Sequence, residues 1–153
     1  MAFSEETEFE PLARRLAAAF GERFGGFTCD PRFDPPLRVR LVSPSADDAD
    51  LVHHLVAQTL GEGHPPWRLD HVSYGLTELE KALADVNRWR ATDARGAAAA
   101  AFVDLDRNAV VLRARNPGAV AKKVRALGLG SALVIEEAVY QPLTVLGTDD
   151  DST

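Results

Sequence analysis

The chain has 153 residues, 46% of them hydrophobic, enough for one domain or for two very small ones that share an interface. Its 17 basic and 23 acidic residues give a net charge of −6, which argues against a protein built mainly to wrap nucleic acid or coat an anionic membrane. A single cysteine, Cys29, excludes an internal disulfide. The sequence shows neither a secretory signal nor an apolar run of roughly 20 residues, so we expect a cytoplasmic protein that does not enter the membrane.

The first half predicts a helix followed by two strands. Ser4 and the acids after it favour a helix start, and apolar residues then recur at helical spacing up to Phe20. A strand is predicted at 24–29, where two glycines permit a bulge or a close backbone approach. The next strand, at 37–42, alternates apolar with basic residues, which indicates one buried and one wet face.

A helix, a strand and a second helix follow. The segment 47–60 predicts a helix and 67–72 a strand, and 73–90 is the clearest helix in the chain. For the helix at 47–60 we expect five inward side chains, those of Leu51, Val52, Leu55, Val56 and Thr59.

The second half repeats this order of elements. It predicts strands at 99–104 and 108–114, a helix capped by Asn116 that runs to Leu127, and a closing strand at 132–137. Val39 precedes Val110 by 71 residues, and Pro44 precedes Pro117 by 73. We therefore predict an α+β fold of two layers, with duplicated ββαβ units, a connecting helix and an extra N-terminal helix.

This organisation predicts three parts. Residues 1–92 hold the N-terminal helix, the first ββαβ subdomain and the connecting helix, which the two units could share; residues 93–138 form the second ββαβ subdomain. Residues 139–153 form a tail that is first apolar and then acidic.

Three segments carry a resemblance to a known family. They are Phe24 to Pro31, Ser73 to Glu80, and Phe102 to Val111. Within the third segment, six residues match the family pattern one by one: Phe102, Val103, Asp104, Asn108, Val110 and Val111. Over about residues 12–138 the chain resembles the propeptides of α-lytic-protease and streptogrisin-type serine proteases. The resemblance implies a duplicated α/β propeptide that acts as an intramolecular chaperone and tight inhibitor, adding a sheet of its C-terminal subdomain to the protease while its tail lies in the substrate cleft. The chain departs from that pattern because it carries no protease and ends in acidic residues.

No pattern for catalysis or for metal binding emerges. There is no Gly-x-Ser-x-Gly sequence, and the serines fall where helix caps or turns explain them. Of the neighbouring His53 and His54, one at most could join His64 or His71 in a metal site, without a third ligand. We expect Cys29 to be a small buried residue. The sequence therefore predicts a protein that is not an enzyme and needs no cofactor.

In one stretch of the second half, residues 107–125, every charged residue is basic. These basic residues are Arg107, Arg113, Arg115, Lys122, Lys123 and Arg125. A solvated face explains such a stretch, and an acidic partner surface is the alternative. Nucleic acid is a weaker candidate, because no aromatic residue interleaves with the basic ones.

The favoured function is protein binding through the closing strand and the tail. The expected partner-binding residues are Leu133, Ile135, Val139, Tyr140, Leu143 and Val145. An edge strand offers unpaired amides and carbonyls that another chain can complete. The partner would be another protein, a serine protease or an assembly partner, or a second copy of the chain, and the role that of a chaperone, an inhibitor or an adaptor. Alternatively, the tail packs back on its own domain.

Overall fold

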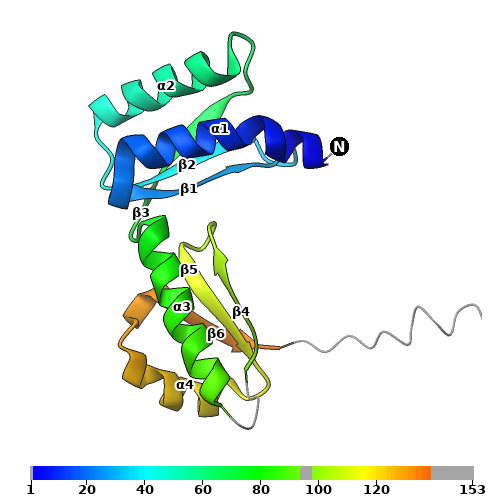
Figure 1. The fold of residues 1–153 in the computed structure, drawn as a ribbon, viewed down its shortest axis with the longest axis vertical. Coiled ribbons are helices and arrows are strands. Elements are labelled where there is room, and N and C mark those ends of the chain that lie inside the picture. Colours follow the sequence, from blue (N-terminus) through cyan, green and yellow to red (C-terminus); the bar gives the residue numbers. More distant parts are fainter. Residues whose placement is uncertain (1, 94–97, 139–153) are drawn as a thin grey trace, which may run out of the picture.

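The computed structural model describes residues 2–93 and 98–138 and has an α+β fold of two stacked subdomains (Figure 1). The first subdomain begins with α1 (Ala2–Phe20) and a short 3₁₀ turn, η1 (Gly21–Arg23). Its sheet has the order β1 (Phe24–Cys29), β2 (Leu37–Val42) and β3 (Trp67–Val72), and α2 (Ala46–Leu60) connects β2 to β3.

The connecting helix α3 (Leu76–Thr92) leads into the second subdomain. There the sheet has the order β4 (Ala98–Asp104), β5 (Ala109–Ala114) and β6 (Leu133–Glu137). The connection from β5 to β6 contains α4 (Pro117–Val124) and two 3₁₀ turns, η2 (Arg125–Leu127) and η3 (Gly130–Ala132). None of the helices in these residues is long and apolar enough to cross a bilayer.

The two sheets have the same topology, which confirms the predicted duplication. In each, the first two strands are antiparallel and the last two are parallel. Each first strand also carries an irregularity near its start, opposite Arg40 in one sheet and Arg113 in the other. These arginines, and the first parallel pairs at Leu37 and Val110, correspond at an offset of 73 residues. The offset of 71 predicted for the strands was therefore wrong by two residues, which leaves every side chain on its predicted face.

Each subdomain has its own hydrophobic core on one face of its sheet. The first core packs α1 and α2 on β1 and β2, around the fully buried Leu16, Val39 and Val56. In the second, α3 and α4 pack on the same face of β5, around Val86 and Leu112. The opposite face of the second sheet carries no helix (Figure 1).

Local sequence explains where the helices begin. Ser45 caps α2 in a reciprocal capping box with Asp48, which satisfies two free amides. Two expectations about helices were wrong. Leu51 is 38% exposed because the α2 stripe is centred on Val52 and Val56. The connecting helix begins at Leu76 rather than at Ser73, because residues 73–75 form the turn that joins the subdomains.

The turn between β4 and β5 connects the two subdomains. Asp104 accepts the amides of Asp106 and Arg107, which closes the turn. Asn108 has a left-handed backbone, with φ of 52°. Its Oδ1 accepts the amides of Ser73 (3.0 Å) and Tyr74 (2.8 Å), and its Nδ2 donates to the Tyr74 carbonyl (2.8 Å). Asn108 therefore ties the second hairpin to the linker after β3.

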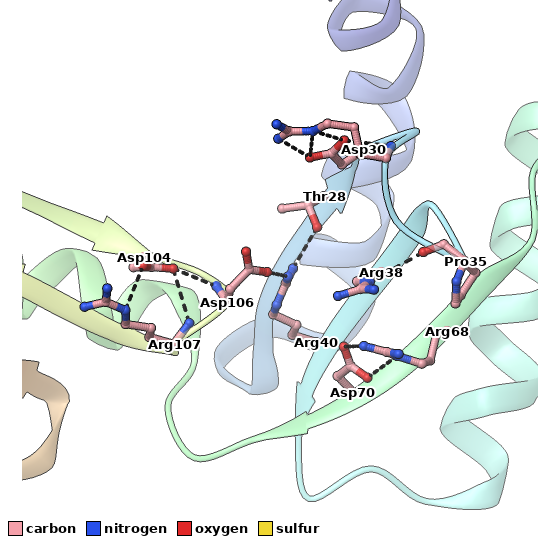
Figure 2. A network of polar contacts seen from close by, with 11 residues as sticks. Thr28, Asp30, Pro35, Arg38, Arg40, Arg68, Asp70, Asp104, Asp106 and Arg107 are labelled. Atoms are coloured by element: carbon pink, nitrogen blue, oxygen red, sulfur yellow. Dashed lines mark hydrogen bonds and ion pairs between the residues drawn. The ribbon is translucent and has the colours of Figure 1, made fainter.

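Arg40 supplies a second connection, shown in Figure 2. Its Nη2 donates to Asp106 Oδ1 at 2.5 Å and its Nη1 to Thr28 Oγ1 at 3.1 Å. The alternation of β2 predicted a wet face for Arg40, yet the residue is 2% exposed. The residues around the turn of the other subdomain cover it, a long-range contact that alternation within one strand cannot reveal.

Two glycines permit this close approach. A Cβ on Gly26 would lie 2.8 Å from Leu105 Cδ2 in the turn of the second hairpin. A Cβ on Gly75 would lie 2.0 Å from the carbonyl oxygen of Glu22 in η1, which no side-chain movement could relieve. Contacts of backbone and buried polar groups thus fix how the two subdomains meet.

Candidate protein-binding site at the β6 edge

The outer strand β6 is the strongest candidate for a binding site. Within the described residues it pairs with β5 on one side and has no strand on the other. The amide of Ala138 donates to the Ala114 carbonyl, and peptide groups alternate in direction along a strand. The amides and carbonyls of Leu133, Ile135 and Glu137 therefore point away from β5, where another strand can pair with them.

A groove of about 300 Å³, lined by both apolar and polar atoms, lies beside this edge, between α4 and β6. We call it the β6 groove. Its apolar lining comes from Ala121, Val124, Leu129, Leu133 and Ile135. Arg125 also lines it, so that the groove combines apolar walls with one cation. A strand paired with β6 would direct every second side chain into this groove.

Local hydrogen bonds and core packing fix the positions of α4 and η3, the elements on the two sides of the groove. Asn116 Oδ1 accepts the Ala119 amide and Pro117 occupies the first helical position of α4. Val120 and Val124 fix α4 in the second core. On the other side of the groove, the hydroxyl groups of Ser131 and Tyr74 are hydrogen-bonded, which ties η3 to the linker that Asn108 holds.

The structure brings together some of the predicted partner-binding residues. Leu133 and Ile135 lie on β6 and line the groove, and both are partly buried against the second core. Val139, Tyr140, Leu143 and Val145 lie outside the described residues. The sequence analysis missed the α4 side of the groove, because Ala121 and Val124 have the spacing of ordinary core residues.

The six residues of the predicted basic patch do not form one surface. Arg113 points to the helix-free face of the sheet, since its neighbours Leu112 and Ala114 pack in the core below α4. There Arg107 Nη1 and Arg113 Nε bind the two oxygens of Glu136, at 2.8 and 2.9 Å. Both hydrogen bonds lower the pKa of Glu136, and the one from Arg107 has the larger effect. Two of the six are thus already paired with an acid.

The other four basic residues are exposed. Lys122 and Lys123 lie on α4, Arg125 follows it directly, and Arg115 lies in the bend between β5 and α4. None of them forms an ion pair with another described residue. The α4 side of the β6 groove therefore carries positive charge available to an acidic ligand.

The remaining chemical candidates lie elsewhere. Cys29 is partly buried at the edge of the first core. The His53 ring contacts the rings of His64 and Trp67, with centroids 6.3 and 6.2 Å apart. In the part of the chain that the structure describes, no three metal-ligating side chains are placed to hold an ion.

Comparison with known proteins does not point to a family for this chain. Neither a scan against models of protein families nor a search of curated proteins finds a match. The function is therefore argued from the site itself.

Proposed function

We propose that the protein is a non-catalytic binding module whose C-terminal subdomain holds an extended segment of another protein along β6. The observation that carries this proposal is the unpaired edge of β6 beside the β6 groove. Main-chain hydrogen bonds to such an edge provide affinity, and pockets for alternate side chains provide specificity.

The groove defines the chemistry of the segment it would accept. The apolar lining favours apolar side chains at every second position. Arg125 favours a carboxylate at one end of the segment, and Lys122 and Lys123 on the exposed side of α4 add to the attraction. The proposed ligand is therefore an extended apolar segment that ends in acidic residues.

The resemblance to protease propeptides supports a role of this kind. The duplicated ββαβ units have the organisation that the resemblance implies, and the edge lies in the C-terminal subdomain. A chaperone, a protease inhibitor and an adaptor or assembly subunit would all use such an edge. The proposed location is the cytoplasm.

Selection from a display library of random twelve-residue peptides against the full-length protein tests the proposal. We expect the recovered peptides to share alternating apolar residues followed by an acid. Ile135→Lys places a charge in the groove and should weaken their binding at least 10-fold. Val134→Lys adds the same charge on the helix-free face of the same strand and should leave binding within about 2-fold. Equal losses in the two variants would reject the groove as the binding site.

A further inference from the structure

We infer that the β6 groove binds the free C-terminus of its partner, which pairs with β6 as an antiparallel strand. The inference rests on the proposed function, because it specifies which kind of segment the same groove accepts. Three features of the described residues support it: the groove is closed at one end, a cation lies at that end, and an acid lies toward the other.

The connection from α4 to β6 closes one end of the groove. Because β5 and β6 run parallel, α4 between them runs in the opposite direction and ends where β6 begins (Figure 1). Leu129 and Gly130 of this connection line the groove together with Leu133, the first residue of β6. A strand laid along β6 therefore meets the connection just beyond Leu133, so a segment that ends there fits better than one that continues.

The charge at the closed end selects a carboxyl terminus. Arg125 lines the groove there and is exposed. Among the described residues it has no ion-pair partner. A guanidinium can bind a carboxylate through two parallel hydrogen bonds, whereas it repels an amino terminus. The carboxylate that Arg125 favours is then the partner's own C-terminus.

The position of this carboxylate fixes the direction of the partner strand. A strand whose C-terminus lies at the start of β6 runs antiparallel to β6. Antiparallel pairing is also slightly more stable per residue than parallel pairing. Leu133, Ile135 and Glu137, whose peptide groups point outward, would each exchange both hydrogen bonds with the partner residue directly opposite.

The same direction assigns a residue type to each position of the partner. Its last residue lies opposite Leu133 and its third from last opposite Ile135, and both side chains face the apolar walls of the groove. The fifth from last lies opposite Glu137, which is exposed and on the same face of β6 as Ile135. Because opposite charges directly across a strand pair are stabilising, a basic residue is expected there. The groove thus favours C-termini of the pattern basic-x-apolar-x-apolar.

Two display libraries of random twelve-residue peptides separate this inference from the proposed function. One library joins the peptides to the carrier protein through their N-termini and leaves the C-terminus free, and the other joins them through their C-termini. On the full-length protein we expect at least 10-fold more binders from the first library, with the basic-x-apolar-x-apolar pattern at their ends. Equal or smaller recovery from the first library would overturn the preference for a C-terminus and leave the groove as a binding site. Absence of binders from both libraries would overturn both proposals.

The most frequent peptide of the first library then tests the role of Arg125. It is synthesised with an N-terminal fluorescent label, as the free acid and as the C-terminal amide, and binding is measured by fluorescence anisotropy. The acid should bind the wild type at least 10-fold more tightly than the amide, and Arg125→Gln should reduce this preference to within about 2-fold. Lys122→Gln removes the same charge from a residue of α4 that does not line the groove and should keep the preference. A preference that survives in Arg125→Gln would overturn the role given to Arg125.

N-methylation of the same peptide tests the direction of the strand. In antiparallel pairing the amide of the third residue from the end donates to the Ile135 carbonyl, whereas the amide of the penultimate residue points away from β6. Methylation of the former should weaken binding at least 10-fold, and methylation of the latter less than about 2-fold. The reverse pattern would show parallel pairing and overturn the inferred direction.

Discussion

Substitution of Asn108 tests how the two subdomains are joined. Asn108→Ala removes three hydrogen bonds, two of them to the adjacent amides of Ser73 and Tyr74. At about 1 kcal/mol of net stability for each bond, this loss amounts to about 3 kcal/mol. Alanine also tolerates a φ of 52° less well than asparagine, which adds about 1 kcal/mol. We expect a total loss of about 4 kcal/mol in the free energy of unfolding.

Asn108→Gly separates the two contributions, because glycine adopts a positive φ without steric cost. It should lose about 3 kcal/mol. Urea unfolding followed by circular dichroism measures both losses, and thermal unfolding should show a fall in Tm of roughly 8–16 °C for the alanine variant. Trp67 reports on the first core and Trp89 on the second. A loss below about 1 kcal/mol in both variants would refute the role given to Asn108.

Four further substitutions test local features of the fold by the same unfolding measurements. Gly75→Ala should lower the free energy of unfolding by more than about 2 kcal/mol, because its Cβ would meet a backbone oxygen at 2.0 Å. Gly118→Ala is the control: this helical site has room for a Cβ, so the change should raise the free energy of unfolding by about 0.5–1 kcal/mol. Equal effects of the two changes would contradict the close approach at Gly75. Ser45→Ala should cost about 1 kcal/mol through loss of the α2 cap, and an unchanged stability would count against the capping box. A hydrogen bond from Arg32 lowers the pKa of Asp30 from 3.8 to about 2. The charged carboxylate therefore stabilises the fold at pH values above its ordinary pKa, and this contribution is lost as the pH falls through about 2. The stability difference between the wild type and Asp30→Asn should therefore be constant above about pH 5 and shrink toward pH 2, and a difference independent of pH would reject the pairing.

Much of the fold follows from periodicity in the sequence. The strands at 24–29, 37–42 and 67–72 were predicted with their observed bounds, since glycines, prolines and other turn residues delimit them. The duplication was visible because both halves repeat the same order of elements. The register between the halves was not, because two apolar strands fit each other equally well when one is shifted by two residues.

Contacts between the subdomains could not be predicted from the sequence. Arg40 has the spacing of an exposed residue and is buried by a turn 66 positions away. Asn108 was singled out as part of a motif, but its hydrogen bonds to the linker at 73–74 depend on how two separate units pack. Such contacts leave no periodic signal in a single chain.

The candidate site was predictable on its strand side alone. Leu133 and Ile135 stood out as part of an apolar closing strand, and its position at the sheet edge follows from the ββαβ order. The groove needs α4 and the turns after it at the correct distance from β6, which residue spacing does not give. The position of Arg113 on the helix-free face follows from the strand alternation between Leu112 and Ala114.

The exchange of the β6 amides during peptide binding tests the proposed function most directly. The experiment uses the full-length protein and a peptide recovered from the display selection. On saturation with that peptide, the amides of Leu133, Ile135 and Glu137, which point outward, should exchange at least 10-fold more slowly, while those of Val134 and Glu136, already bonded to β5, should change little. Unchanged exchange at the three outward amides, with peptide bound, would contradict binding at the β6 edge.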